Sequence, residues 1–90
     1  MSVVSVTVEL TYEMGKRLGA HSFQVDGASS VAEVVAAARE RFGDQAGEFE
    51  TLSRVAAVAV NGVLVNYRKG LKTPLADGDR ISFVKAAAGG

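Results

Sequence analysis

The group in this sequence best suited to chemistry is the carboxylate that follows Gly89-Gly90, the last two of 90 residues. An α-carboxyl group has a pKa of about 3.3–3.7, so it is ionised at neutral pH and becomes an electrophile only after another molecule activates it. The residues before the glycines, Ala86, Ala87 and Ala88, are small and lose almost no side-chain entropy when they are ordered. Glycine has no side chain that would block a narrow channel. The pattern predicts an arm that threads the Gly90 carboxylate into the active site of another protein.

The side chains offer little other chemistry. The sequence has no cysteine, which excludes disulfides, thiolate zinc sites, iron–sulfur clusters and thiol nucleophiles. Its one histidine, His21, is too few for a histidine metal site. Asp77 and Asp79 flank Gly78, and a tight turn explains these residues better than a catalytic carboxylate pair does. We therefore expect that the chain itself binds no metal and no cofactor.

Charge and composition narrow the class of protein. Ninety residues make one domain, and the contents of 48% hydrophobic and 22% charged residues are those of an ordinary globular domain. The net charge of zero argues against a nucleic-acid binder. Arg68, Lys69 and Lys72 form a small basic cluster that we interpret as solvated loop charge, with attraction of an acidic partner as the alternative. No apolar run reaches the roughly 20 residues of a membrane helix, and no signal peptide is visible. We expect a cytoplasmic protein that is monomeric when free and has no membrane partner.

The first half of the chain predicts a hairpin and a helix. Residues 3–10 alternate apolar and polar side chains, as a half-buried strand does, and residues 20–25 repeat the pattern more briefly. The segment 11–20 contains two glycines and is predicted to be a loop. Ser30 and Glu33 form a capping box that predicts a helix over 31–42, ended by Gly43. Its apolar stripe consists of Val31, Val34, Val35, Ala38 and Phe42.

The second half predicts three strands. Residues 44–54 are predicted to be a polar connection whose Phe49 and Leu52 reach the edge of the core. A strand over 55–60, the hairpin turn Asn61-Gly62 and a return strand over 63–65 follow, and the last strand covers 80–84. One helix packed on one face of a mixed sheet of four to five strands is an α+β fold. We predict a ubiquitin-like β-grasp over residues 1–85, with the first and last strands parallel at the sheet centre and a flexible tail over 86–90.

Several segments together resemble the ubiquitin-like sulfur-carrier proteins of the MoaD/ThiS family. These segments are "VNG" after the third strand, "GLKTPLADGD", the strand after it and the terminal Gly-Gly. The resemblance implies that the chain is not an enzyme but a protein co-substrate. A partner of the ubiquitin-activating type would use ATP and Mg²⁺ to adenylate the Gly90 carboxylate, and sulfur would displace AMP. The thiocarboxylate would donate sulfur to a biosynthetic enzyme that makes a sulfur-containing cofactor or metabolite.

The same resemblance, with the strand pattern, predicts the residues that contact the partner. They are the tail residues Ala86, Ala87, Ala88 and Gly89, together with Val84 and Arg80 on the outward face of the last strand. The sequence departs from the molybdopterin-type pattern, because Lys85 and Ala86 stand where such proteins often have prolines. The outward face of the first strand is also polar.

Three other functions remain open at this stage. The chain could be a ubiquitin-like modifier joined to lysines through Gly90, which needs the same activation. It could be the small subunit of molybdopterin synthase, held stably by a large subunit. It could also be a β-grasp binding module in which Gly89-Gly90 has no chemical role.

Overall fold

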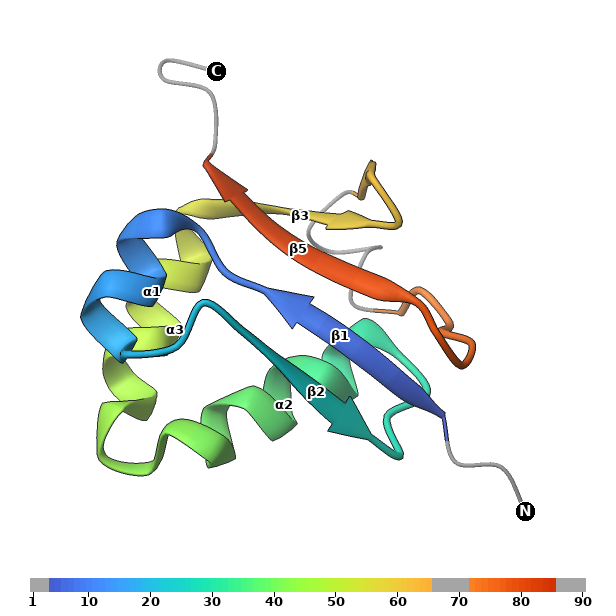
Figure 1. Cartoon of the computed structure of the whole chain (residues 1–90), viewed down its shortest axis with the longest axis horizontal. Coiled ribbons are helices and arrows are strands. Elements are labelled where there is room, and N and C mark those ends of the chain that lie inside the picture. The colour runs from blue at the N-terminus through green and yellow to red at the C-terminus, as the bar shows by residue number, and fades with distance from the viewer. Residues whose placement is uncertain (1–3, 66–71, 86–90) are drawn as a thin grey trace.

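The structure, a computed structural model, describes residues 4–65 and 72–85 (Figure 1). The predicted tail, residues 86–90, lies outside these described residues, and so do Arg68 and Lys69. The elements, in chain order, are β1 (Ser5–Glu9), α1 (Tyr12–Leu18), β2 (Ser22–Asp26), α2 (Val31–Phe42), the 3-10 helix η1 (Gly43–Gln45), α3 (Ala46–Arg54), β3 (Ala56–Val60), β4 (Val63–Val65) and β5 (Arg80–Lys85).

The five strands form one mixed sheet in the order β2-β1-β5-β3-β4. The first and last strands are parallel neighbours at its centre, with Val8 opposite Ile81, and every other pairing is antiparallel. Figure 1 shows β5 between β1 and β3. The predicted α+β fold with a central parallel pair is confirmed.

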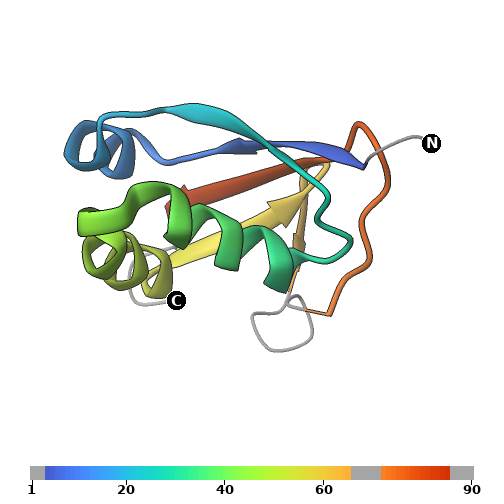
Figure 2. The same cartoon turned by 90° about the horizontal axis from the view of Figure 1, so that it is seen from below.

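Helices close one side of this sheet. Figure 2 shows α2 and α3 on the same face, with α1 at one end of the sheet. Strand residues alternate between buried and partly exposed, so one face of each central strand supplies the core. The buried apolar cluster consists of Val6, Val8, Leu10, Met14, Leu18, Phe23, Val25, Ala28, Val31, Val34, Ala38, Phe49, Val58, Leu75, Ile81 and Phe83.

Helix α2 has the predicted bounds and the predicted cap. Ser30 is extended (φ −148°), and its hydroxyl oxygen accepts a hydrogen bond from the backbone N–H of Glu33 at 3.3 Å. This bond satisfies one of the N–H groups that have no partner within the helix. Gly43 follows the last turn with φ 50°, a conformation that favours glycine.

Residues 11–20 were predicted to be a loop, and that prediction was wrong. The segment contains helix α1, because Thr11 caps it by accepting a hydrogen bond from the N–H of Met14 at 3.0 Å. Met14 and Leu18, four residues apart, are buried on its inner face. Gly15 is buried inside the helix because His21 packs against it, and a Cβ there would lie 2.2 Å from the imidazole Nδ1.

Residues 44–54 were predicted to be a polar connection between a helix and a strand, and this prediction was also wrong. They form η1 and α3, so the described part of the chain has three α-helices where the sequence predicts one. Phe49 does not lie at the core edge as expected but is 1% exposed. Its ring stacks on Phe42 at 5.4 Å and forms a T-shaped pair with Phe83 at 5.8 Å between centroids. Aromatic packing of this kind holds α3 to the sheet.

The turn at Asn61-Gly62 is confirmed and is bonded to the start of β5. Both residues have positive φ (51° and 85°), as the tight turn of a two-residue hairpin requires. The Asn61 side-chain oxygen accepts from the N–H of Arg80 at 3.0 Å, and the Asn61 N–H donates to the Arg80 carbonyl at 2.8 Å. No helix among residues 4–65 and 72–85 is long and apolar enough to cross a membrane.

Candidate functional site

The place where the chain leaves the domain toward Gly90 is the end of β5, at Lys85. Strand β1 is parallel to β5 and ends at the same end of the sheet. Strand β3 is antiparallel to β5 and begins at that end, with Ala56 opposite Lys85. Helix α1 follows β1 and α3 precedes β3, so both helices have an end near the end of β5 (Figure 1). The predicted tail residues Ala86, Ala87, Ala88, Gly89 and Gly90 lie outside the described residues.

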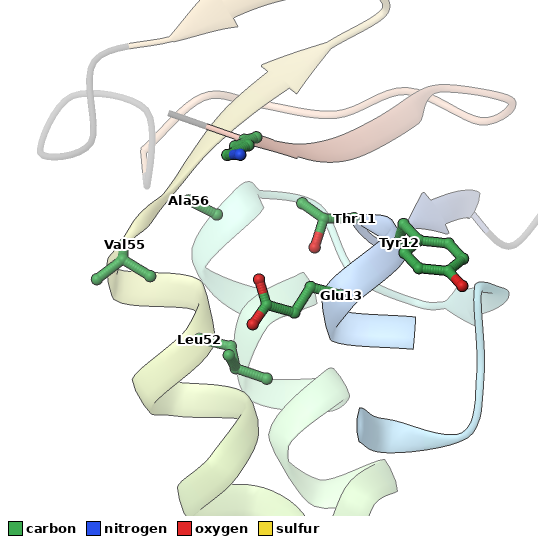
Figure 3. A pocket seen from close by; sticks show the side chains of 7 residues that line it. Thr11, Tyr12, Glu13, Leu52, Val55 and Ala56 are labelled. Atoms are coloured by element: carbon green, nitrogen blue, oxygen red, sulfur yellow. The ribbon is translucent and has the colours of Figure 1, made fainter. Parts of the chain in front are cut away.

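A cleft of about 330 Å³ opens at this end of the sheet, on the face that the helices cover. We call it the tail-root cleft; it is lined by Thr11, Tyr12, Glu13, Leu52, Val55, Ala56 and Lys85. Figure 3 shows Leu52 and Val55 on the α3 side and Glu13 opposite, with its carboxylate extended toward them, while the Tyr12 ring points away. That ring stacks on His21 at 6.3 Å.

Sequence reasoning did not find this cleft. Its lining comes from three segments, near residues 12, 54 and 85, that only the sheet topology brings together. One signal was available in Tyr12, an aromatic residue in a segment predicted to be a loop, whereas Val55 had been assigned to the strand predicted over 55–60. In the structure Val55 and Tyr12 are 71% and 77% exposed.

The opposite face of β5 carries the predicted contact residues Val84 and Arg80. The register places Val84 beside Ala57 of β3, and Ser82 beside Ala59, which in turn is opposite Leu64 of β4. Val84 and Ala57 are half-buried, Ala59 is buried and Leu64 is 65% exposed. Val84 therefore belongs to an apolar strip that crosses three strands. The other three members were not predicted, because their shared face depends on the strand register.

Arg80 lies on the same face as Val84 but at the other end of β5, four residues or about 13 Å away. Its Nε is 3.8 Å from Oε1 of Glu9, which also accepts a hydrogen bond from the Ser82 hydroxyl at 3.1 Å. The outer face is thus apolar toward the end of β5 and polar toward its start. The predicted polar face of β1 is confirmed, since Ser5, Thr7 and Glu9 lie away from the core.

The two aspartates at 77 and 79 build a turn and no catalytic pair. Asp77 Oδ1 accepts from the N–H of Ser5 at 2.8 Å. Asp79 Oδ2 accepts from the N–H of Ala76 at 2.8 Å, and its Oδ1 accepts from the Asn61 amide at 3.0 Å. The Ala76 bond, with a smaller effect of the Asn61 bond, lowers the pKa of Asp79 below its ordinary value of 3.8. No group of three His, Asp or Glu side chains in the described part of the chain is arranged to hold a metal ion.

Comparison with known proteins identifies a matching family and several proteins of similar fold. A family model described as the ThiS family matches residues 13–90. The small archaeal modifier protein 1 (SAMP1) from Methanosarcina acetivorans is 18% identical, with all of both chains covered and a TM-score of 0.73. SAMP1 from Haloferax volcanii is 21% identical, with 96% of this chain and 99% of that chain covered and a TM-score of 0.63. These two likenesses show the fold alone.

A further structural likeness has higher sequence identity. It is to a chain in the complex of subunits 1 and 2 of molybdopterin-converting factor from Helicobacter pylori. The identity is 25%, the TM-score is 0.63, and 97% of this chain and 100% of that chain are covered. The search of curated proteins found no match.

Proposed function

The chain belongs to the ThiS family, and from this premise we propose that it is a sulfur carrier whose Gly90 carboxylate is converted to a thiocarboxylate. The observation that supports this most is that the family match runs to residue 90 and so includes the residues after β5. The described side chains offer no second site for chemistry beside the Gly90 carboxylate. They contain no group that could hold a metal ion, and Asp77 and Asp79 accept hydrogen bonds from backbone N–H groups.

The chemistry takes place on a partner enzyme of the ubiquitin-activating type. An oxygen of the Gly90 carboxylate attacks the α-phosphorus of ATP, pyrophosphate leaves, and an acyl-adenylate forms; Mg²⁺ on the enzyme balances the phosphate charge. A sulfide nucleophile then attacks the acyl carbon and AMP leaves. The thiocarboxylate is finally consumed by an enzyme that builds a sulfur-containing cofactor or metabolite.

The folded surface supplies affinity and the tail supplies reactivity. Ordering five small residues is unfavourable by about 1–2 kcal/mol each, and they have little apolar area to bury in return. Contacts on the domain must offset this loss. Val84 and the apolar strip beside it lie at the end of β5, where an enzyme that holds the tail will meet them.

Mass spectrometry and ATP–pyrophosphate exchange test this function. The chain, purified from cells that contain its enzymes, is expected to carry one sulfur in place of one oxygen at its terminus. Deletion of Gly90 is expected to abolish exchange while the affinity for the adenylating enzyme stays within about tenfold, because the docking surface is intact. Ala87→Gly, which keeps the tail length, serves as control and retains exchange. Full exchange without Gly90 would refute the proposal, and isopeptide conjugates in place of a thiocarboxylate would identify a protein modifier.

A second candidate is the small subunit of a two-subunit molybdopterin-converting factor. The 25% identity to a chain of such a complex favours it. The polar outer face of β1 and the absence of prolines at Lys85 and Ala86 argue against it. Stable co-purification with a larger subunit would support this assignment, whereas isolation as a free monomer supports the dissociable carrier.

A further inference from the structure

The tail is too short to separate the domain from the enzyme that acts on Gly90. Five residues follow Lys85, and a fully extended chain of five residues spans at most about 18 Å. On the proposed function, on which this inference rests, an active site that binds the Gly90 carboxylate lies within that distance of Lys85. The enzyme surface around the mouth of that site therefore lies against whatever surrounds Lys85.

What surrounds Lys85 on the helix side is the tail-root cleft. Leu52 and Ala56 are half-buried there, and Val55 stands at its border with 71% of its surface exposed. Among the described residues, four large hydrophobic side chains are this exposed: Tyr12 and Val55 at the cleft, and Val63 and Leu64 on β4. A hollow with an apolar wall and an exposed valine at its border has the form of a receptor for a partner's anchoring side chain.

The rim of the cleft is charged with both signs. Glu13 extends its carboxylate toward the α3 side (Figure 3). Lys85, at the end of β5, also lines the cleft and contributes an ammonium group. Glu13 also pairs with Arg17 at 3.5 Å on the exposed side of α1. An apolar hollow inside a polar rim matches the anatomy of a protein–protein contact. The rim has no concentration of positive charge that would suit a phosphate or a nucleic acid.

The tail itself is a poorer occupant than a partner. Alanine and glycine offer little apolar surface to a hollow lined by Leu52 and Val55, and folding the tail back orders five residues at about 1–2 kcal/mol each. A leucine-sized side chain on a folded enzyme is already ordered in part, so it buries more apolar area at a smaller loss of entropy.

We propose that the tail-root cleft receives an aliphatic or aromatic side chain of the adenylating enzyme. Val84 on the outer face and the cleft on the helix side then contact the enzyme on both sides of the strand that leads into the tail. Successive residues of β5 alternate between faces, so the two contacts are independent surfaces. Held in this way, Lys85 at the end of β5 directs the residues that follow it toward the active site.

Two matched valines allow a direct test. Val55 borders the cleft and is 71% exposed, whereas Val63 is 67% exposed at the far end of β3 and β4. Val55→Glu and Val63→Glu place the same charge at sites of similar exposure, and Val55→Leu keeps the cleft apolar. Binding to the adenylating enzyme encoded in the same genome is measured by calorimetry, and pyrophosphate exchange gives KM and kcat. Thermal unfolding checks that all three variants fold.

Val55→Glu is expected to raise Kd and KM about tenfold or more, while Val63→Glu and Val55→Leu stay within about threefold. Equal Kd for the two glutamate variants, with the wild-type chain still adenylated, would overturn the cleft assignment and leave the sulfur-carrier function standing. A wild-type chain that is not adenylated at all would overturn both. If Val55→Glu shifts the NMR signals of residues 86–90 in the free chain without changing the affinity for the enzyme, the cleft binds the tail and the proposal is wrong.

Discussion

The contact between Gly15 and His21 predicts the effect of Gly15→Ala on stability. Whether this change stabilises or destabilises the protein depends on the His21 side chain alone. A Cβ on Gly15 would lie 2.2 Å from Nδ1, 2.7 Å from Cε1 and 2.9 Å from Cγ of His21. Carbon atoms pack best at about 3.5–4.0 Å, so the ring would have to move by more than 1 Å. Rotation of the ring about the Cβ–Cγ bond does not suffice, because Cγ lies on that axis and is itself too close, so the whole side chain would have to move.

The free energies follow from two opposing effects of Gly15→Ala. Overpacking of this kind typically destabilises by about 1–3 kcal/mol, and moving the imidazole also disturbs its stack on Tyr12. Alanine inside a helix is favoured over glycine by about 0.5–1 kcal/mol. We therefore expect Gly15→Ala to destabilise the protein by up to about 2.5 kcal/mol. In a His21→Ala background the clash is absent, and the same change is expected to stabilise by about 0.5–1 kcal/mol.

Urea unfolding of four proteins measures this coupling. These are the wild type, the two single variants and the double variant, followed by circular dichroism, and the expected coupling energy is about 1–3 kcal/mol. Gly47→Ala in α3 is the control, because a Cβ there meets nothing within 4 Å, and it is expected to stabilise by about 0.5–1 kcal/mol. A coupling energy near zero, with Gly15→Ala stabilising in both backgrounds, would show that the imidazole is not the reason for a glycine inside α1.

Three further outcomes are expected. Phe49→Ala removes a ring that is 1% exposed and should lower the free energy of unfolding by about 3–5 kcal/mol in urea titrations, against less than about 0.5 kcal/mol for the exposed Val63→Ala; similar losses for both would contradict the packing of α3. Asp79 accepts bonds that lower its pKa, so its contribution to stability is present above 3.8 and is lost as pH falls through its lower folded pKa. Asp79→Asn should therefore be less stable than the wild type at neutral pH, and the difference should shrink in acid; a constant difference in melts across pH would refute this. Val84→Asp should weaken binding to the adenylating enzyme by about 1–3 kcal/mol in calorimetry, while Gln24→Asp, an exposed change on β2, should leave it unaltered.

Local signals were enough to predict the elements whose patterns are complete within a few residues. The alternation over 3–10, the Ser30 cap and the Asn61-Gly62 turn each encode one structure without help from distant residues. Taken together, these patterns were enough to predict the sheet, α2 and the parallel pairing of the first and last strands at its centre. The terminal Gly-Gly pointed to a family that the match over residues 13–90 confirms.

The two missed helices show where local reasoning stops. Helix α1 had a Thr11 cap and the pair Met14 and Leu18 at helical spacing, but the two glycines of residues 11–20 suggested a loop. One of them, Gly15, is needed inside the helix because the His21 imidazole, which only the fold brings near, occupies the space of a Cβ. Helix α3 has few apolar residues, and Phe49 and Leu52 at a spacing of three were too few to predict a stripe. The tail-root cleft could not be predicted, because its walls are more than 25 residues apart in the sequence.

The central position of β5 also has a mechanical consequence. The strand that continues into the tail is held on both sides, by β1 over three residue pairs and by β3 over five. Force applied to the tail, whether by an enzyme that draws it in or by a machine that extracts the chain, loads two ladders of hydrogen bonds together. An edge strand would instead be peeled away one bond at a time. How long a domain withstands a pulling force depends on its unfolding rate, which the height of the unfolding barrier sets. The domain is therefore expected to stay folded under a pull on the end of β5 that would detach an edge strand.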